Sequence, residues 1–72
     1  MLTKTEKELV KLLRAHVDND TGCYILIKLK DDSSNYVKMI DWLKQPKNRH
    51  ASQSAILKHA DDILGIVSYA AI

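Results

Sequence analysis

The last nine residues of the chain, 64–72 (LGIVSYAAI), carry no charge, and Ser68 is their only plainly polar side chain. A contiguous apolar segment is rarely left open to water in a soluble protein. The whole chain has 72 residues, and a domain of this size buries only about 60% of the surface that its unfolded form exposes. The apolar end therefore needs a surface to cover it, and a second copy of the chain is the simplest one.

Stability considerations also favour association. A single core below roughly 70–80 residues rarely supplies more than about 3–5 kcal/mol, and small domains usually add disulfides, a metal or oligomerisation. Cys23 is the only cysteine, so an internal disulfide is excluded. His16, His50 and His59 stand apart, at none of the spacings that zinc sites use. We therefore expect no metal or other cofactor, and a homo-oligomer, most simply a dimer.

The composition indicates one ordinary domain, residues 1–72, in the cytoplasm. The first residues (MLTKTEKE) do not resemble a secretion signal, and a single cysteine is typical of a reducing compartment. No uncharged stretch approaches the roughly 18 residues of a membrane-spanning helix, so no membrane is expected. The formal net charge of +2 does not by itself indicate a nucleic-acid partner.

Residues 4–18 are predicted to form the first helix. Thr3 with Glu6, or Thr5 with Glu8, has the spacing of a capping box. Apolar side chains then recur at helical spacing, and turn-forming residues at 19–22 (NDTG) are predicted to end the helix. The apolar positions are Leu9, Val10, Leu13 and Val17.

Residues 23–30 (CYILIKLK) are compatible with two structures. As a strand they would pair with the C-terminal segment and make the protein α+β. As a buried helix, capped by Asp20 or Thr21, they would complete an all-α fold. We favour the helix because a lone strand leaves its backbone groups unpaired. Cys23, set among apolar neighbours, is expected to be a buried, unreactive thiol.

A third helix is predicted to begin within 31–35 (DDSSN) and to end near Gln45, before Pro46. Trp42 lies at the edge of its apolar stripe, either covering the rim of the core or anchoring a partner. A last helix is predicted from about Ser52. Gly65 is either a tolerated surface glycine of that helix or its end. The apolar seam of the last helix is Ile56, Ala60, Ile63, Val67 and Ala70.

These elements predict an all-α protein, with three or four short helices in a small bundle. The expected core is Leu9, Leu13, Ile27, Ile40, Leu43, Ile56 and Ala60.

We expect a small interaction or accessory protein that self-associates through its C-terminal segment. Such a short chain leaves little concave surface for a substrate pocket, so we do not expect an enzyme. The predicted interface is Trp42, Ile63, Val67, Tyr69, Ala70 and Ile72.

Two other functions are compatible with the sequence. The basic loop 44–50 and the start of the following helix could bind a DNA backbone. The chain could instead be an inhibitor or antitoxin-like partner of a larger protein. The residues predicted to contact nucleic acid are Lys44, Lys47, Arg49, His50 and Gln53.

Overall fold

The computed structural model describes residues 3–30 and 32–65, and within these ranges every regular element is a helix. The protein is therefore all-α, as predicted, and the alternative α+β fold is wrong because residues 23–28 belong to a helix. The elements are α1 (Lys4–Arg14), α2 (Asn19–Lys28), α3 (Ser33–Lys44), the short 3₁₀ helix η1 (Pro46–Asn48) and α4 (Gln53–Leu64).

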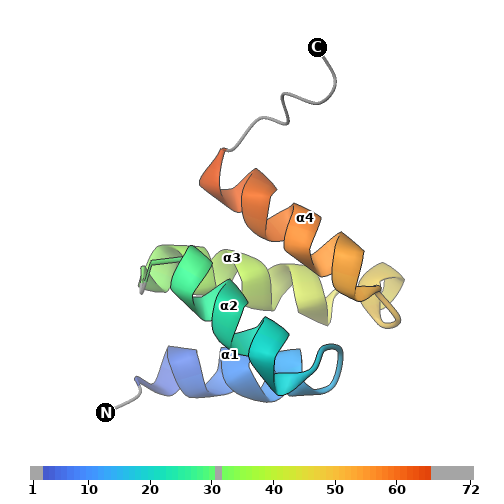
Figure 1. The fold of residues 1–72 in the computed structure, drawn as a ribbon, viewed down its shortest axis with the longest axis horizontal. Coiled ribbons are helices and arrows are strands. Elements are labelled where there is room, and N and C mark those ends of the chain that lie inside the picture. The colour runs from blue at the N-terminus through green and yellow to red at the C-terminus, as the bar shows by residue number, and fades with distance from the viewer. Residues whose placement is uncertain (1–2, 31, 66–72) are drawn as a thin grey trace.

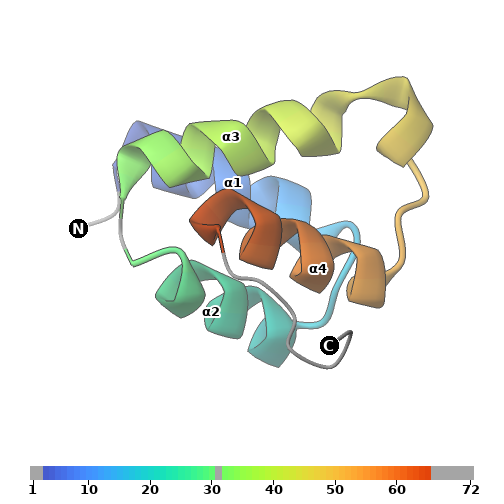
Figure 2. The same ribbon diagram turned by 90° about the horizontal axis from the view of Figure 1, so that it is seen from above.

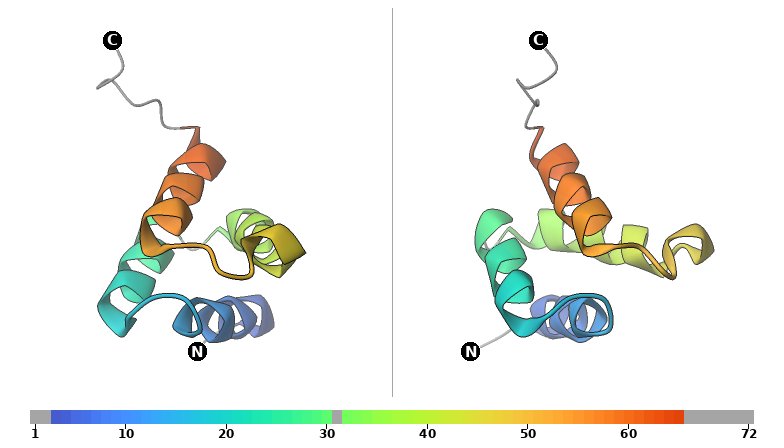
Figure 3. Two further views of the ribbon diagram at one scale, coloured as in Figure 1. Left: turned by 90° about the vertical axis from the view of Figure 1, so that its right-hand side faces the viewer. Right: turned by 45° about the vertical axis from the view of Figure 1, so that its right-hand side comes forward.

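The four α-helices form a closed circuit. α1 and α3 run in the same direction, and α2 and α4 run back across them (Figures 1 and 2). α1 packs against α2 and α3, and α4 packs against the same two helices. Seen from the side, the helices surround the space that the core fills (Figure 3).

The boundary between α1 and α2 differs from the prediction. Thr3 Oγ1 accepts a hydrogen bond from the Glu6 N–H at 3.1 Å, which confirms the first of the two capping possibilities. α1 then ends at Arg14 rather than near residue 18, and Asp18 caps α2 by accepting from the Thr21 N–H at 2.7 Å. Residues 19–22 are therefore the first turn of α2. The residue types favoured in turns are also favoured at a helix start, and here the Asp18 cap decides between them.

The ends of α3 follow the prediction closely. Asp32 Oδ1 accepts from the Ser34 N–H at 2.8 Å and caps the helix. Gln45 is extended, as expected for the residue before a proline. The Trp42 carbonyl at the end of α3 accepts two hydrogen bonds, from the Gln45 N–H at 3.2 Å and from the Asn48 side chain of η1 at 2.7 Å.

Gly65 ends α4. Its φ of 73° places it in the left-handed region, where glycine avoids the strain that a Cβ would cause. The interpretation of Gly65 as a surface glycine within a longer helix is therefore wrong. Within α4 the predicted seam comprises Ile56, Ala60 and Ile63, whereas Val67 and Ala70 lie outside the described residues.

Most of the predicted core is confirmed. Leu9, Leu13, Ile40, Leu43, Ile56 and Ala60 are buried. Among the described residues, five further side chains are buried, namely Val17, Ile25, Leu29, Tyr36 and Met39.

Ile27 was predicted to be buried, and this is wrong, because its side chain is 75% exposed. α2 directs Ile25 and Leu29 into the core, and both are 0% exposed. Ile27 is about 200° around the helix from Ile25, so the two cannot share a face. Cys23 is likewise exposed rather than buried. The outer face of α2 is thus more apolar than the sequence prediction allows.

Candidate functional site

An apolar surface feature lies between α1 and α2. A crevice of about 210 Å³ separates the two helices. We refer to this crevice and its margins as the α1–α2 surface. Its apolar part is formed by Val10, Cys23, Leu26 and Ile27.

The packing of α2 produces this surface. Because Ile25 and Leu29 fill the core, Leu26 is left half-buried at the margin and Ile27 projects outward. On α1, Leu9 and Leu13 point inward and Val10 is half-buried beside them. A shallow depression continues from Cys23 and Leu26 to Ile27. The two helices therefore contribute one continuous apolar strip.

Cations line the α1 side of the strip. A shallow depression on α1 is lined by Lys7, Val10, Lys11 and Arg14. These residues have the spacing that brings side chains together on one helix face. Arg14 also borders the crevice itself. The strip thus has a positive flank along α1.

Acidic groups occur at the two ends of the strip. Glu6 borders the depression beside Ile27, and Asp18 borders the far end of the crevice. The hydrogen bond from the Thr21 N–H stabilises the charged form of Asp18 and lowers the pKa of its carboxyl. The Asp18 carboxylate is therefore already hydrogen-bonded to the backbone at the start of α2.

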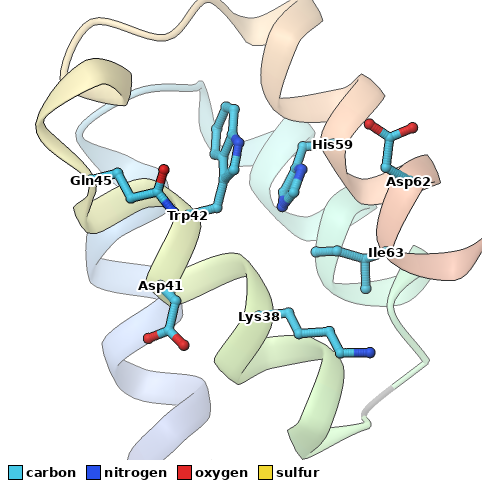
Figure 4. A pocket seen from close by; sticks show the side chains of 7 residues that line it. All are labelled: Lys38, Asp41, Trp42, Gln45, His59, Asp62 and Ile63. Atoms are coloured by element: carbon cyan, nitrogen blue, oxygen red, sulfur yellow. The ribbon is translucent and has the colours of Figure 1, made fainter.

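A second, more polar groove lies between α3 and α4 (Figure 4). It has a volume of about 410 Å³ and is open to solvent. The rings of Trp42 and His59 stack here, with centroids 4.5 Å apart and planes inclined by 13°. The Asp41 carboxylate points away from the stacked rings, whereas Lys38 extends beside Ile63 (Figure 4).

Burial beside Trp42 lowers the pKa of His59 below its ordinary value of 6.5, because partial desolvation disfavours the imidazolium. The negative charge of Asp62 acts in the opposite direction but is the smaller effect. His59 is therefore held as the neutral ring over a wider pH range than a free histidine.

Stability is expected to depend on this titration. Between the lowered pKa of folded His59 and the unfolded value near 6.5, the unfolded chain binds more protons at this position. The contribution of His59 is therefore complete above about pH 6.5 and is lost as the pH falls. Urea denaturation at several pH values from about 5 to 7.5 measures this dependence. His59→Gln should reduce it, and equal dependence in the variant and the unmodified protein would contradict the assignment.

Two ion pairs connect helices that are distant in sequence. Lys28 Nζ on α2 pairs with Asp61 Oδ1 on α4, and this contact raises the pKa of Lys28. Lys28 Nζ also lies 5.3 Å from the centroid of the Tyr24 ring. On the other side of the bundle, Lys44 on α3 pairs with Glu8 on α1.

The structure places two residues of the predicted interface together. Trp42 and Ile63 both line the α3–α4 groove and pack against the core. Both are half-buried, which fits the expectation that Trp42 covers the rim of the core. The other four predicted interface residues, Val67, Tyr69, Ala70 and Ile72, lie outside the described residues.

The predicted nucleic-acid residues are all on the surface. Lys44, Lys47, Arg49, His50 and Gln53 are exposed. The Lys44 ammonium is already paired with Glu8, which raises the pKa of Lys44 and reduces the free positive charge of the loop. These residues therefore offer less charge to a phosphate backbone than the sequence suggests.

The sequence analysis missed the α1–α2 surface. It assigned Ile27 and Cys23 to the interior, and so left no apolar residues on the outer face of α2. A signal was present in the spacing, because Cys23, Leu26 and Ile27 recur at three and four residues. The helical pattern of residues 23–30 thus has two apolar faces, of which only one can point inward.

Two kinds of site were not found in the part of the chain that the structure describes. No three His, Cys, Asp or Glu side chains lie close enough together to hold a metal ion. None of the helices has the length and apolarity needed to cross a membrane. Comparison with family models, curated protein sequences and solved structures found no significant match.

Proposed function

We propose that this protein is a small interaction module that binds another protein through the α1–α2 surface. The observation that carries the proposal is the 75% exposure of Ile27, adjacent to Leu26 and Cys23 in one strip. Isolated exposed apolar side chains are ordinary, whereas contiguous ones often mark a binding surface. This role is one of binding rather than catalysis.

The energetics of the chain support the same proposal. Burying a side chain such as isoleucine yields about 1.5–3 kcal/mol. α2 leaves Ile27 open while the core is filled by other residues. A partner that covered Ile27 and Leu26 would gain this contribution without any rearrangement of the core.

Photo-crosslinking tests the proposal. A benzophenone amino acid is introduced at position 27 of the full chain in cells that produce it, and adducts are identified by mass spectrometry. We expect a discrete adduct with another protein. Position 37 on α3 is the matched control, because Val37 is also an exposed aliphatic residue, at 46%. Absence of an adduct at position 27, or the same adducts at both positions, would contradict the proposal.

Other expectations from the sequence stay predictions. A cytoplasmic location is supported by the single cysteine. A homodimer formed through Ile63, Val67, Tyr69, Ala70 and Ile72 is tested by sedimentation equilibrium of the unmodified chain and of Val67→Asp. A monomeric mass for both would overturn the dimer. An inhibitor-like role is compatible with the proposed module, since such a protein also acts by binding a larger one.

A further inference from the structure

We infer that the occupant of the α1–α2 surface is an acidic amphipathic helix of a partner protein. This inference rests on the proposed function and specifies the chemistry of the partner.

The shape of the strip suits a helix. Val10 of α1 borders the crevice on one side, Cys23 and Leu26 of α2 border it on the other, and Ile27 lies beside them in the adjoining depression. An amphipathic helix presents apolar side chains at three- and four-residue spacing, and it binds by laying them along such a groove. Ile27 and Leu26 would contact these side chains.

The charges beside the strip favour acidic residues on the flank of that helix. Lys7, Lys11 and Arg14 are exposed along the α1 side. Among the described residues, the ion pairs involve Lys28 and Lys44 instead of these three cations. Glu6 and Asp18 lie at the ends of the strip, and Asp18 is hydrogen-bonded to the start of α2. The charge of Lys11 also acts on Glu8, which is ion-paired with Lys44. The α1 flank therefore offers Lys7, Lys11 and Arg14 to carboxylates of a partner.

The same cations also affect how a second copy of the chain could bind at this surface. A symmetric dimer places the same patch of both copies together. With a two-fold axis across the strip, the positive flanks of the two copies would meet, and like charges across an interface are unfavourable. With an axis along the strip the flanks would lie apart, and sedimentation equilibrium of the unmodified chain distinguishes that dimer from a chain that binds an acidic partner.

The test is a titration of the isotope-labelled full chain with three designed peptides, followed by amide NMR shifts. Each peptide has about 18 residues, enough for a helix of about 27 Å, with leucines along one face. The flanking positions carry glutamate, glutamine or lysine. We expect shifts at Val10, Cys23, Leu26 and Ile27, and about tenfold tighter binding of the glutamate peptide than of the glutamine peptide. Raising the ionic strength from about 0.05 to 0.5 M should remove most of this preference.

Two matched variants separate local charge from net charge. Lys7→Gln, Lys11→Gln and Arg14→Gln together should abolish the tenfold preference for the glutamate peptide. Lys47→Gln, Arg49→Gln and Lys58→Gln together remove the same number of exposed cations elsewhere and should preserve it. Thermal melts establish that both triple variants remain folded. An equal loss of preference in the two variants would overturn the inference.

The remaining outcomes are equally distinct. Equal binding of all three peptides at this surface would overturn the acidic partner and leave the proposed interaction function standing. If none of the three peptides binds, the inference of an acidic helical partner is also overturned. The crosslink at position 27 tests the interaction function independently. Vesicles of equal phosphatidylglycerol and phosphatidylcholine are titrated in parallel. If they shift these amides and the glutamate peptide does not, the surface binds anionic lipid and the inference is wrong.

Discussion

Ile25→Ala is expected to destabilise the protein by about 2–5 kcal/mol, and Ile27→Ala by less than about 0.5 kcal/mol. The two isoleucines lie on the same helix and lose the same atoms. Ile25 is fully buried, so its truncation leaves a cavity and removes contacts with the core, whereas Ile27 is 75% exposed. Alanine also has the higher helix propensity, which offsets part of the small loss at position 27. Urea denaturation followed by far-ultraviolet circular dichroism measures both changes.

The graded variant Ile25→Val keeps this prediction measurable. A domain of this size rarely has more than about 3–5 kcal/mol of stability, so Ile25→Ala is expected to be largely unfolded at room temperature. Ile25→Val should cost only about 0.5–1.5 kcal/mol and give a complete unfolding transition. Equal losses at positions 25 and 27 would show that α2 is rotated about its axis relative to the structure described above.

Trp42→Ala is expected to destabilise the protein by about 2–3 kcal/mol, below the usual cost for a fully buried tryptophan because this ring is half-buried. The substitution removes the stacking on His59 and the cover over the core between α3 and α4. It should also raise the pKa of His59 toward its ordinary value, since the imidazole becomes more hydrated. Urea denaturation and a proton NMR titration of the His59 ring measure the two effects.

Two further variants test the specificity of the Trp42 result. Trp42→Phe retains an aromatic ring and should lose less stability than Trp42→Ala. Val37→Ala, on the exposed side of the same helix, should change the stability by no more than about 0.5 kcal/mol. A Trp42→Ala variant in which the pKa of His59 stays low would mean that another element desolvates the ring.

The predictable part of the fold was the part with one clear apolar face. α1, α3 and α4 each combine an apolar stripe with a polar opposite side, and every core residue predicted on these three helices is buried. The predicted core nevertheless lacked Tyr36 and Met39 of α3. Residues 23–30 are apolar on nearly every side, so periodicity could not show which face is buried. The packing of α2 against α1 and α4 determines which face of α2 is buried. Contacts between helices cannot be predicted from the spacing of apolar residues within one helix.

For the same reason, the candidate site could not be predicted from the sequence. The α1–α2 surface exists because Val10 on α1 comes close to Leu26 on α2, which depends on how the two helices pack. Trp42 could be placed at the rim from its position on the stripe, but its stacking on His59 could not, since the two belong to different helices. The sequence therefore predicted the burial of individual side chains better than the contacts between them.

The circuit of helices has a consequence for how the chain reaches its folded state. In the described residues the backbones of α2 and α3 do not approach closely, although the two helices are consecutive and the Asn35 side chain of α3 donates to the Leu29 carbonyl at the end of α2. The backbones of α1 and α4 are likewise apart. α3 instead joins α1, and α4 returns to α2. A fragment ending after α2 would lack α3, the helix against which α1 packs most extensively. No N-terminal fragment is therefore expected to fold by itself. Folding should accordingly be cooperative, and the unfolding transitions measured on the four α-helices should coincide.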